Sequence, residues 1–293
     1  MLKRPTKKIK FCQRKLILPM VNRKRVILGC GYIGKALLEF WHHDKKNLIA
    51  TTTSAERQRG LEPFAGEVVV VEGDDRAALR KLLSRAKQVI VCVAPKMGDS
   101  YANVYLNTAK ALCDVLKEGT SVEQLVYTSS VSVYGEQGGG WVTEDDTVKP
   151  IGINGEILCE TETVYLNVFT PNNIAATVLR LGGIYGPGRE HESRTRKMAG
   201  KIFSGSGDQY SNWIHQEDAV RAIDWVLKRR LGGIYNLCSE DHPTRKALYD
   251  QITAPLQLPS VQWDVSQEGS HSATRRFQAK SLRGQASSFF ILR

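Results

Sequence analysis

The sequence lacks the features that mark membrane, disulfide-rich and zinc proteins. No apolar run reaches the roughly 18 residues that a membrane span needs. The six cysteines are scattered singly through 293 residues and form no Cys-x-x-Cys pair. Isolated cysteines are typical of a reducing compartment, and they disfavour both a disulfide framework and a structural metal site. We therefore expect a cytoplasmic protein that binds no metal.

Basic charge is distributed unevenly along the chain. The net charge is +11, yet residues 1–25 contain ten lysines and arginines and no acidic residue. The rest of the chain holds 31 basic and 30 acidic side chains and is nearly neutral. Because the basicity belongs to a tail, we expect residues 1–23 to be a disordered N-terminal extension. Binding of RNA or acidic lipids and a targeting role are the alternatives, and nucleic-acid binding is not favoured.

The most informative segment joins a predicted strand to a predicted helix through Gly-x-Gly-x-x-Gly. A strand predicted at 25–28, with three apolar residues after Arg25, leads into this loop, a helix follows it, and a second strand is expected at 47–53. Such a unit binds a dinucleotide, because main-chain N–H groups and the helix N-terminus face the pyrophosphate. Gly29 permits the turn, Gly31 leaves space for phosphate, and Gly34 lets the helix pack on the strand. The predicted cofactor residues of the loop are Gly29, Cys30, Gly31, Tyr32, Ile33 and Gly34.

Apolar runs and amphipathic stretches alternate after this loop. We expect strands at 47–53, 68–72, 89–94, 124–128 and 175–181, and helices at 76–86, 101–117, 156–168 and 219–228. This alternation predicts an α/β, Rossmann-like fold with a doubly wound parallel sheet. The alternation weakens after residue 186. Residues 24–293 are therefore expected to form one NAD(P)-binding domain, with a small C-terminal substrate lobe drawn mainly from 187–293.

The end of the second strand bears on the choice between NAD and NADP. An NAD site usually has an acidic residue there, which holds the ribose 2′-hydroxyl. This sequence instead has hydroxyl residues at 51–54, followed by Arg57. Hydroxyls and a guanidinium bind a 2′-phosphate, which a carboxylate would repel. We assign Ser54 and Arg57 to the cofactor site and favour NADP slightly over NAD, although Glu56 weakens the distinction.

Two further strand ends are assigned to the cofactor. Asp74 follows the third strand, where a carboxylate can accept a hydrogen bond from the adenine amino group. Ala94 and Pro95 end the fourth strand with small, rigid residues beside which the cofactor can pass. Both assignments depend on position alone, because ligands of such sheets bind beyond the carboxyl ends of the strands. Ordinary turns are the alternative.

Four downstream segments carry a family resemblance. They are Tyr127–Gly135 (YTSSVSVYG), Leu179–Arg189 (LRLGGIYGPGR), Trp213–Ala219 (WIHQEDA) and Gly233–Leu237 (GIYNL). With the glycine loop they resemble, in the same order, the motifs of extended short-chain dehydrogenases/reductases of the NAD-dependent epimerase/dehydratase type. The resemblance implies a nucleotide-sugar or related hydroxyl or carbonyl substrate, and a homodimer. It also implies Ser129 beside the cofactor, Ser130 as a catalytic hydroxyl, and Arg189 and His215 facing the substrate.

The sequence departs from that family at its catalytic Tyr-x-x-x-Lys pair. In the family the lysine lowers the pKa of the tyrosine, which moves a proton at a substrate hydroxyl. Here Asn154 stands at the tyrosine position and Leu158 at the lysine position. An amide does not titrate, and leucine has no hydrogen-bond donor. The chain therefore resembles an atypical branch of the family.

Two hypotheses about function follow from this departure. The first is an enzyme with a modified mechanism, whose further candidates for proton transfer are Tyr134, Glu156 and Lys96. The second is a catalytically silent protein whose bound dinucleotide serves a structural, redox-sensing or partner-binding role. The glycine loop supports dinucleotide binding under both hypotheses and does not distinguish between them.

Overall fold

A seven-stranded parallel sheet forms the centre of the molecule. The computed structural model describes residues 24–168, 174–267 and 276–277. Neighbouring strands follow the order β11-β7-β5-β4-β1-β2-β3, and every pair is parallel. The strands are β1 (Arg25–Leu28), β2 (Leu48–Thr52), β3 (Glu67–Val70), β4 (Gln88–Val91), β5 (Gln124–Ser130), β7 (Ala175–Leu181) and β11 (Gly233–Leu237). The strand order reverses beside β1, which confirms the predicted doubly wound, Rossmann-like α/β fold.

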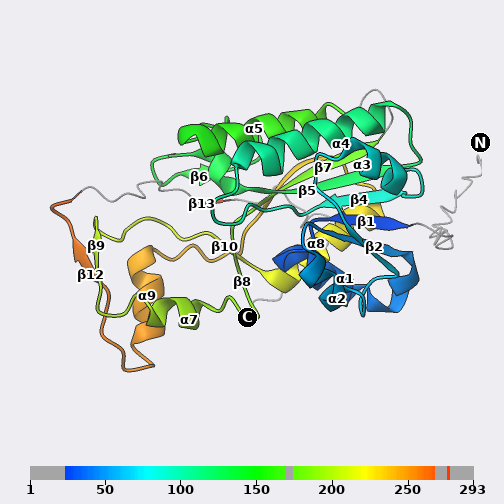
Figure 1. Cartoon of the computed structure of the whole chain (residues 1–293). Helices are drawn as coiled ribbons and strands as arrows, with labels where there is room; N and C mark the ends of the chain where they lie inside the picture. The colour runs from blue at the N-terminus through cyan, green and yellow to red at the C-terminus, as the bar shows by residue number, and fades with distance from the viewer. Residues whose placement is uncertain (1–23, 169–173, 268–275, 278–293) are drawn as a thin grey trace, which may run out of the picture.

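Helices cover both faces of this sheet (Figure 1). One face carries α3 (Arg76–Leu83), α4 (Thr108–Lys117) and α5 (Gly152–Leu166), and the other carries α1 (Tyr32–Phe40), α2 (Ala55–Leu61) and α8 (Gln216–Arg229). Each face has its own apolar core: Leu112 and Tyr127 are fully buried in the first, and Leu37 and Ile223 in the second. Because both faces are covered, the central strands β1, β4 and β5 are largely buried and consist mostly of apolar residues.

The helices differ from their predicted bounds, most of all the second and the third along the chain. The helix expected at 101–117 consists of a π-helix, η2 (Ala102–Asn107), followed by α4. A π-helix holds more residues per turn than an α-helix, so side chains of η2 point in directions that an α-helical pattern does not predict. The helix α5 begins at Gly152 instead of 156, directly after the extended residue Ile151. Short 3-10 helices η1 (His42–Asn47) and η3 (Val131–Tyr134) follow α1 and β5.

A smaller lobe lies beside the sheet (Figure 1). Its parts are the paired strands β8 (Gly183–Tyr185) with β10 (Trp213–His215), the paired strands β9 (Ile202–Ser204) with β12 (Gln262–Asp264), and the helices α7 (His191–Arg196) and α9 (Arg245–Thr253). Phe203, Tyr249 and Trp263 join β9, α9 and β12, with ring centroids 5.9 to 6.4 Å apart. The lobe is not continuous in sequence, because α8 and β11, which lie between its parts along the chain, belong to the sheet domain.

Three details complete the architecture. The strand β6 (Trp141–Val142) pairs with β13 (Arg276–Phe277). The predicted N-terminal extension, residues 1–23, lies outside the described residues. Within the described part of the chain, no helix combines the length and the apolar character that a membrane crossing requires.

Candidate functional site

A cavity of about 700 Å³ opens at the carboxyl ends of the central strands. Its volume lies within the range of ~300–1,000 Å³ that is usual for small-molecule and cofactor sites. The wall combines the glycine loop with residues that follow β2, β3, β4, β5 and β7. The predicted site residues in this wall are Gly29, Cys30, Gly31, Tyr32, Ile33, Arg57, Asp74, Ala94, Ser129, Ser130 and Arg189. Gly34, Ser54, Pro95 and His215 do not line it.

The glycine loop has the geometry of a phosphate cradle. Gly29 adopts a φ of +90°, and a Cβ there would lie 2.8 Å from the main-chain nitrogen of Val93. A Cβ on Gly34 would lie 2.5 Å from the carbonyl oxygen of Gly29, so α1 packs directly on the loop. A Cβ on Gly31, by contrast, would meet open space. The tight positions shape the turn, and the open one faces the cavity.

The N-terminus of α1 provides the charge for an anion. Gly31 is its N-cap, no side chain caps the helix, and its first turn has no acidic residue. The first main-chain N–H groups of a helix have no partner within the helix and carry its positive dipole end. This combination of free donors and open space fits a pyrophosphate.

Thr51 fixes the loop, although the sequence did not single it out. Its Oγ1 accepts a hydrogen bond from the Gly29 N–H at 2.9 Å and donates to the Ile27 carbonyl at 3.2 Å. Cys30 donates its main-chain N–H to the Thr51 carbonyl at 2.9 Å. Its thiol points inward, where burial raises its pKa to about 12. Cys30 therefore offers its backbone to the cavity.

The end of the cavity beside β2 and β3 has a mixed charge. Thr52, Thr53 and Arg57 line it after β2, and Glu72 and Asp74 line it after β3. Arg57 donates from Nη2 to the Cys30 carbonyl at 3.1 Å, so its guanidinium lies against the glycine loop. Ser54 is the N-cap residue of α2 and does not line the cavity, whereas its neighbours Thr52 and Thr53 do.

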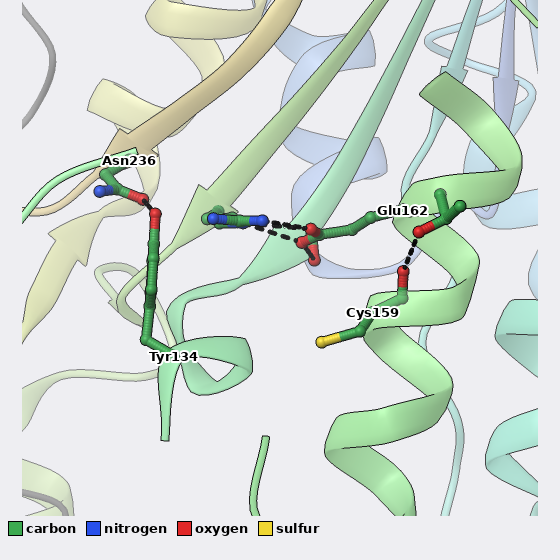
Figure 2. Close-up of polar contacts among 7 residues, drawn as sticks. Tyr134, Cys159, Glu162 and Asn236 are labelled. Carbon is green, nitrogen blue, oxygen red and sulfur yellow. Dashed lines mark hydrogen bonds and ion pairs between the residues drawn. The ribbon is translucent and has the colours of Figure 1, made fainter. Parts of the chain in front are cut away.

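Ser129 belongs to a buried polar network (Figure 2). Its hydroxyl donates to Glu162 on α5 at 2.6 Å, and Glu162 forms a two-nitrogen ion pair with Arg180 at 2.7 and 3.1 Å. The guanidinium carbon of Arg180 lies 4.6 Å from the ring centroid of Tyr134. The Tyr134 hydroxyl donates to Asn236 at 2.9 Å. This network ties α5 to β5, β7, η3 and β11, and it places Tyr134 in the core, away from the cavity wall.

Neither residue at the family's catalytic positions reaches the cavity wall. Asn154 is exposed on the first turn of α5. Leu158 is buried in an apolar cluster with Val131, Val142 and Tyr134. Ser130 does line the cavity, and its Oγ accepts a hydrogen bond from the Ser132 N–H at 3.1 Å. This bond uses the Ser130 oxygen as an acceptor, so the hydroxyl proton can still be donated to a ligand.

The π-helix and the loop before it supply residues that the sequence reasoning missed as a group. Asn103 and Tyr105 of η2 line the cavity, together with Lys96 and Asp99. Tyr105 also packs against the cluster that contains Leu158. Burial, with a smaller effect of Tyr101, raises the pKa of Tyr105 to about 12. An α-helical pattern over 101–117 gave no signal for this arrangement, because it does not include the π-turn.

The two predicted substrate residues lie in different surroundings. Arg189 lines the cavity, with its guanidinium carbon 4.1 Å from the ring centroid of Tyr32. His215 is the N-cap of α8, and its Nδ1 accepts a hydrogen bond from the Glu217 N–H at 3.3 Å. Its ring packs edge-on against Tyr185, at 5.1 Å between centroids. In this structure His215 joins β10 to α8. Among the described residues, no three His, Cys, Asp or Glu side chains gather as metal ligands.

Comparison with known proteins decides the family. The model of the NAD dependent epimerase/dehydratase family matches residues 26–238. The chain belongs to this family. Protein YeeZ of Escherichia coli strain K12 is 27% identical over 254 residues, which cover 82% of this chain and 86% of YeeZ.

Solved structures of the epimerase/dehydratase type share the fold. The dTDP-glucose 4,6-dehydratase of Bacillus anthracis, in complex with NAD, has a TM-score of 0.76 at 19% identity and 91% coverage of both chains. The UDP-glucose 4-epimerase of Thermotoga maritima, with UDP-glucose, has a TM-score of 0.74 at 17% identity and covers 89% of this chain and 91% of its own.

Proposed function

We propose that this member of the epimerase/dehydratase family binds a nicotinamide dinucleotide and acts on a nucleotide-sugar or a related hydroxyl or carbonyl substrate by a modified mechanism. The observation that carries the proposal is the uncapped N-terminus of α1 beside the open position at Gly31. Both lie in one cavity, whose wall continues to Ser129 and Ser130. Its shape therefore offers an anion cradle and a polar reaction end in one continuous space.

The proposed cofactor residues divide by the part of the dinucleotide that they hold. The glycine loop binds the pyrophosphate through main-chain N–H groups. Asp74 faces the adenine, and Thr53 and Arg57 face the adenosine ribose, where they favour a 2′-phosphate and hence NADP. Ala94 leaves room at the fourth strand. When bound, the dinucleotide supplies the hydride acceptor or donor, and the chain's own residues orient the substrate and handle the proton.

Proton handling falls to hydroxyls because the family's tyrosine and lysine are replaced. Ser130 and Tyr105 both line the cavity. Burial raises the pKa of Tyr105 to about 12, so its phenol is a weaker acid than an ordinary tyrosine, although it is still more acidic than the alcohol that carbonyl reduction forms. We assign Ser130 to orient the substrate oxygen and Tyr105 to donate the proton during carbonyl reduction.

Thermal unfolding with and without dinucleotide tests the cofactor proposal. A ligand at one hundred times its Kd stabilises the folded state by about 2.7 kcal/mol. For a chain of this size we expect NADPH to raise Tm by roughly 5–10 °C. Gly31→Asp abolishes the shift, because a carboxylate fills the phosphate space and repels the anion. Gly60→Asp is the matched control, since a Cβ at Gly60 also meets open space and Gly60 lies outside the cavity wall. A shift that survives Gly31→Asp contradicts the assigned site.

A catalytically silent dinucleotide-binding protein is the second candidate. The exposure of Asn154 and the burial of Leu158 favour it, because neither presents a group to the cavity. Incubation with UDP-glucose or dTDP-glucose and the dinucleotide, followed by chromatography of the products, separates the two. Conversion that falls at least a hundred-fold in Tyr105→Phe supports the enzyme. A Tm shift without conversion of either sugar nucleotide favours the silent protein.

A further inference from the structure

Tyr32 connects the glycine loop to the lobe. Its hydroxyl donates to the Pro187 carbonyl at 3.1 Å, and its own carbonyl accepts from Gln216 Nε2 at 3.0 Å. Gly186 sits in the notch between these contacts, where an added Cβ would lie 3.2 Å from the Tyr32 hydroxyl. Tyr32 is also the first residue of α1. The lobe segment 186–189 is thus held directly against the phosphate end of the cofactor loop.

Arg189 carries an available charge at this junction. Its guanidinium carbon lies 4.1 Å from the ring centroid of Tyr32, and the residue is exposed to the cavity. The adjacent acid, Glu190, accepts the Gly188 N–H at 2.7 Å instead. Among the described residues no carboxylate forms an ion pair with Arg189. The cation–π contact with Tyr32 positions this guanidinium.

The electrostatics of this arrangement favour an anion between the Arg189 guanidinium and the N-terminus of α1. A guanidinium beside the positive end of α1 is a like-charge arrangement, because no acidic residue lies in the first helical turn to offset it. A diphosphate placed there would contact both positive groups. Arginine also binds phosphate with two parallel N–H donors, which a lysine cannot do.

We infer that Arg189 is a diphosphate ligand of the dinucleotide, supplied from the lobe to the glycine loop. Tyr32 holds the guanidinium over the helix N-terminus, and cofactor binding draws the lobe onto the sheet domain through this contact. This inference rests on the proposed function, because it requires a dinucleotide in the cavity. It assigns Arg189 to the diphosphate of the cofactor. The alternative ligand of Arg189 is the diphosphate of a nucleotide-sugar substrate.

Titration calorimetry on the full chain tests this inference with two probes. ADP-ribose carries the diphosphate and adenosine of the cofactor without the nicotinamide, and UDP represents the nucleotide end of a sugar-nucleotide substrate. We expect Arg189→Ala to weaken ADP-ribose binding about ten-fold or more, the size of one charge-assisted hydrogen bond, and to leave UDP binding unchanged. Arg189→Lys recovers only part of the loss. Tyr32→Leu weakens ADP-ribose binding, whereas Tyr32→Phe, which keeps the ring, does not.

Arg229→Ala is the matched control, because Arg229 lies 4.1 Å from the Trp225 ring centroid and outside the cavity wall. It must leave ADP-ribose binding intact. If Arg189→Ala binds ADP-ribose as tightly as the unsubstituted protein does, the inference is wrong. If Arg189→Ala weakens the binding of UDP alone, Arg189 is a ligand of the substrate and the inference is also wrong. If the unsubstituted protein itself does not bind ADP-ribose, the proposed function fails first. Circular dichroism of each variant confirms that the fold is kept.

Discussion

Replacement of Glu162 by glutamine tests the buried network beneath the cavity. Glu162 accepts hydrogen bonds from Ser129 at 2.6 Å and from Nε and Nη2 of Arg180 at 3.1 and 2.7 Å. The side chains of Glu162 and Arg180 are only 4% and 5% exposed. Glutamine keeps the shape of the side chain but leaves the Arg180 charge uncompensated in the interior. Removal of one partner of a buried ion pair costs about 3–5 kcal/mol.

Urea unfolding followed by circular dichroism measures this cost. For a chain of this size we also expect the Tm of Glu162→Gln to be about 6–20 °C lower than that of the unsubstituted protein. The control is Glu192→Gln, which breaks the exposed pair with Arg196 (2.8 Å, side chains 53% and 49% exposed). That change costs less than about 0.5 kcal/mol. A loss below about 1 kcal/mol in Glu162→Gln would refute the buried pair. The double variant Glu162→Leu with Arg180→Met should recover most of the stability, because neither charge is then left alone.

Three further predictions follow from the site. NADPH should raise Tm more than NADH, and Arg57→Ala should remove the difference; equal shifts in the unsubstituted protein would reject the NADP preference. Gly34→Ala should lower the free energy of unfolding by roughly 1–3 kcal/mol and weaken dinucleotide binding, because its Cβ would lie 2.5 Å from the Gly29 carbonyl oxygen. The thiols of Cys30 and Cys92, whose pKa values burial raises to about 12, should resist iodoacetamide at pH 8.5 in the folded protein. Rapid labelling of Cys30 would contradict its buried placement. The raised pKa values also contribute to the free energy of unfolding: this contribution is complete below the ordinary thiol pKa and is lost as the pH rises toward 12. Urea unfolding at pH 8 and at pH 10.5 measures the loss.

The sequence by itself determined the sheet and the glycine loop. Strand composition and spacing are local properties, so β7 has the bounds that the apolar pattern predicts, and β11 coincides with the segment that carries the family resemblance. The loop is equally local, since Gly29, Gly31 and Gly34 act through their own backbone and the helix that follows. The departure at Asn154 and Leu158 is also visible in the sequence, and the structure adds only where those side chains lie.

Tertiary structure alone decided the composition of the cavity wall beyond that loop. The π-turn of η2, which brings Tyr105 to the wall, depends on packing against α5 and leaves no periodic signal. Residues far apart in sequence meet there as well: Ser129 is bound by Glu162, and Arg189 lies over Tyr32. Their partners are set by how helices and the lobe dock on the sheet, and side-chain spacing along the chain carries no information about that docking. The glycine loop that could bind an anion is therefore predictable from the sequence, whereas the other residues of the cavity wall are brought together only by the tertiary structure.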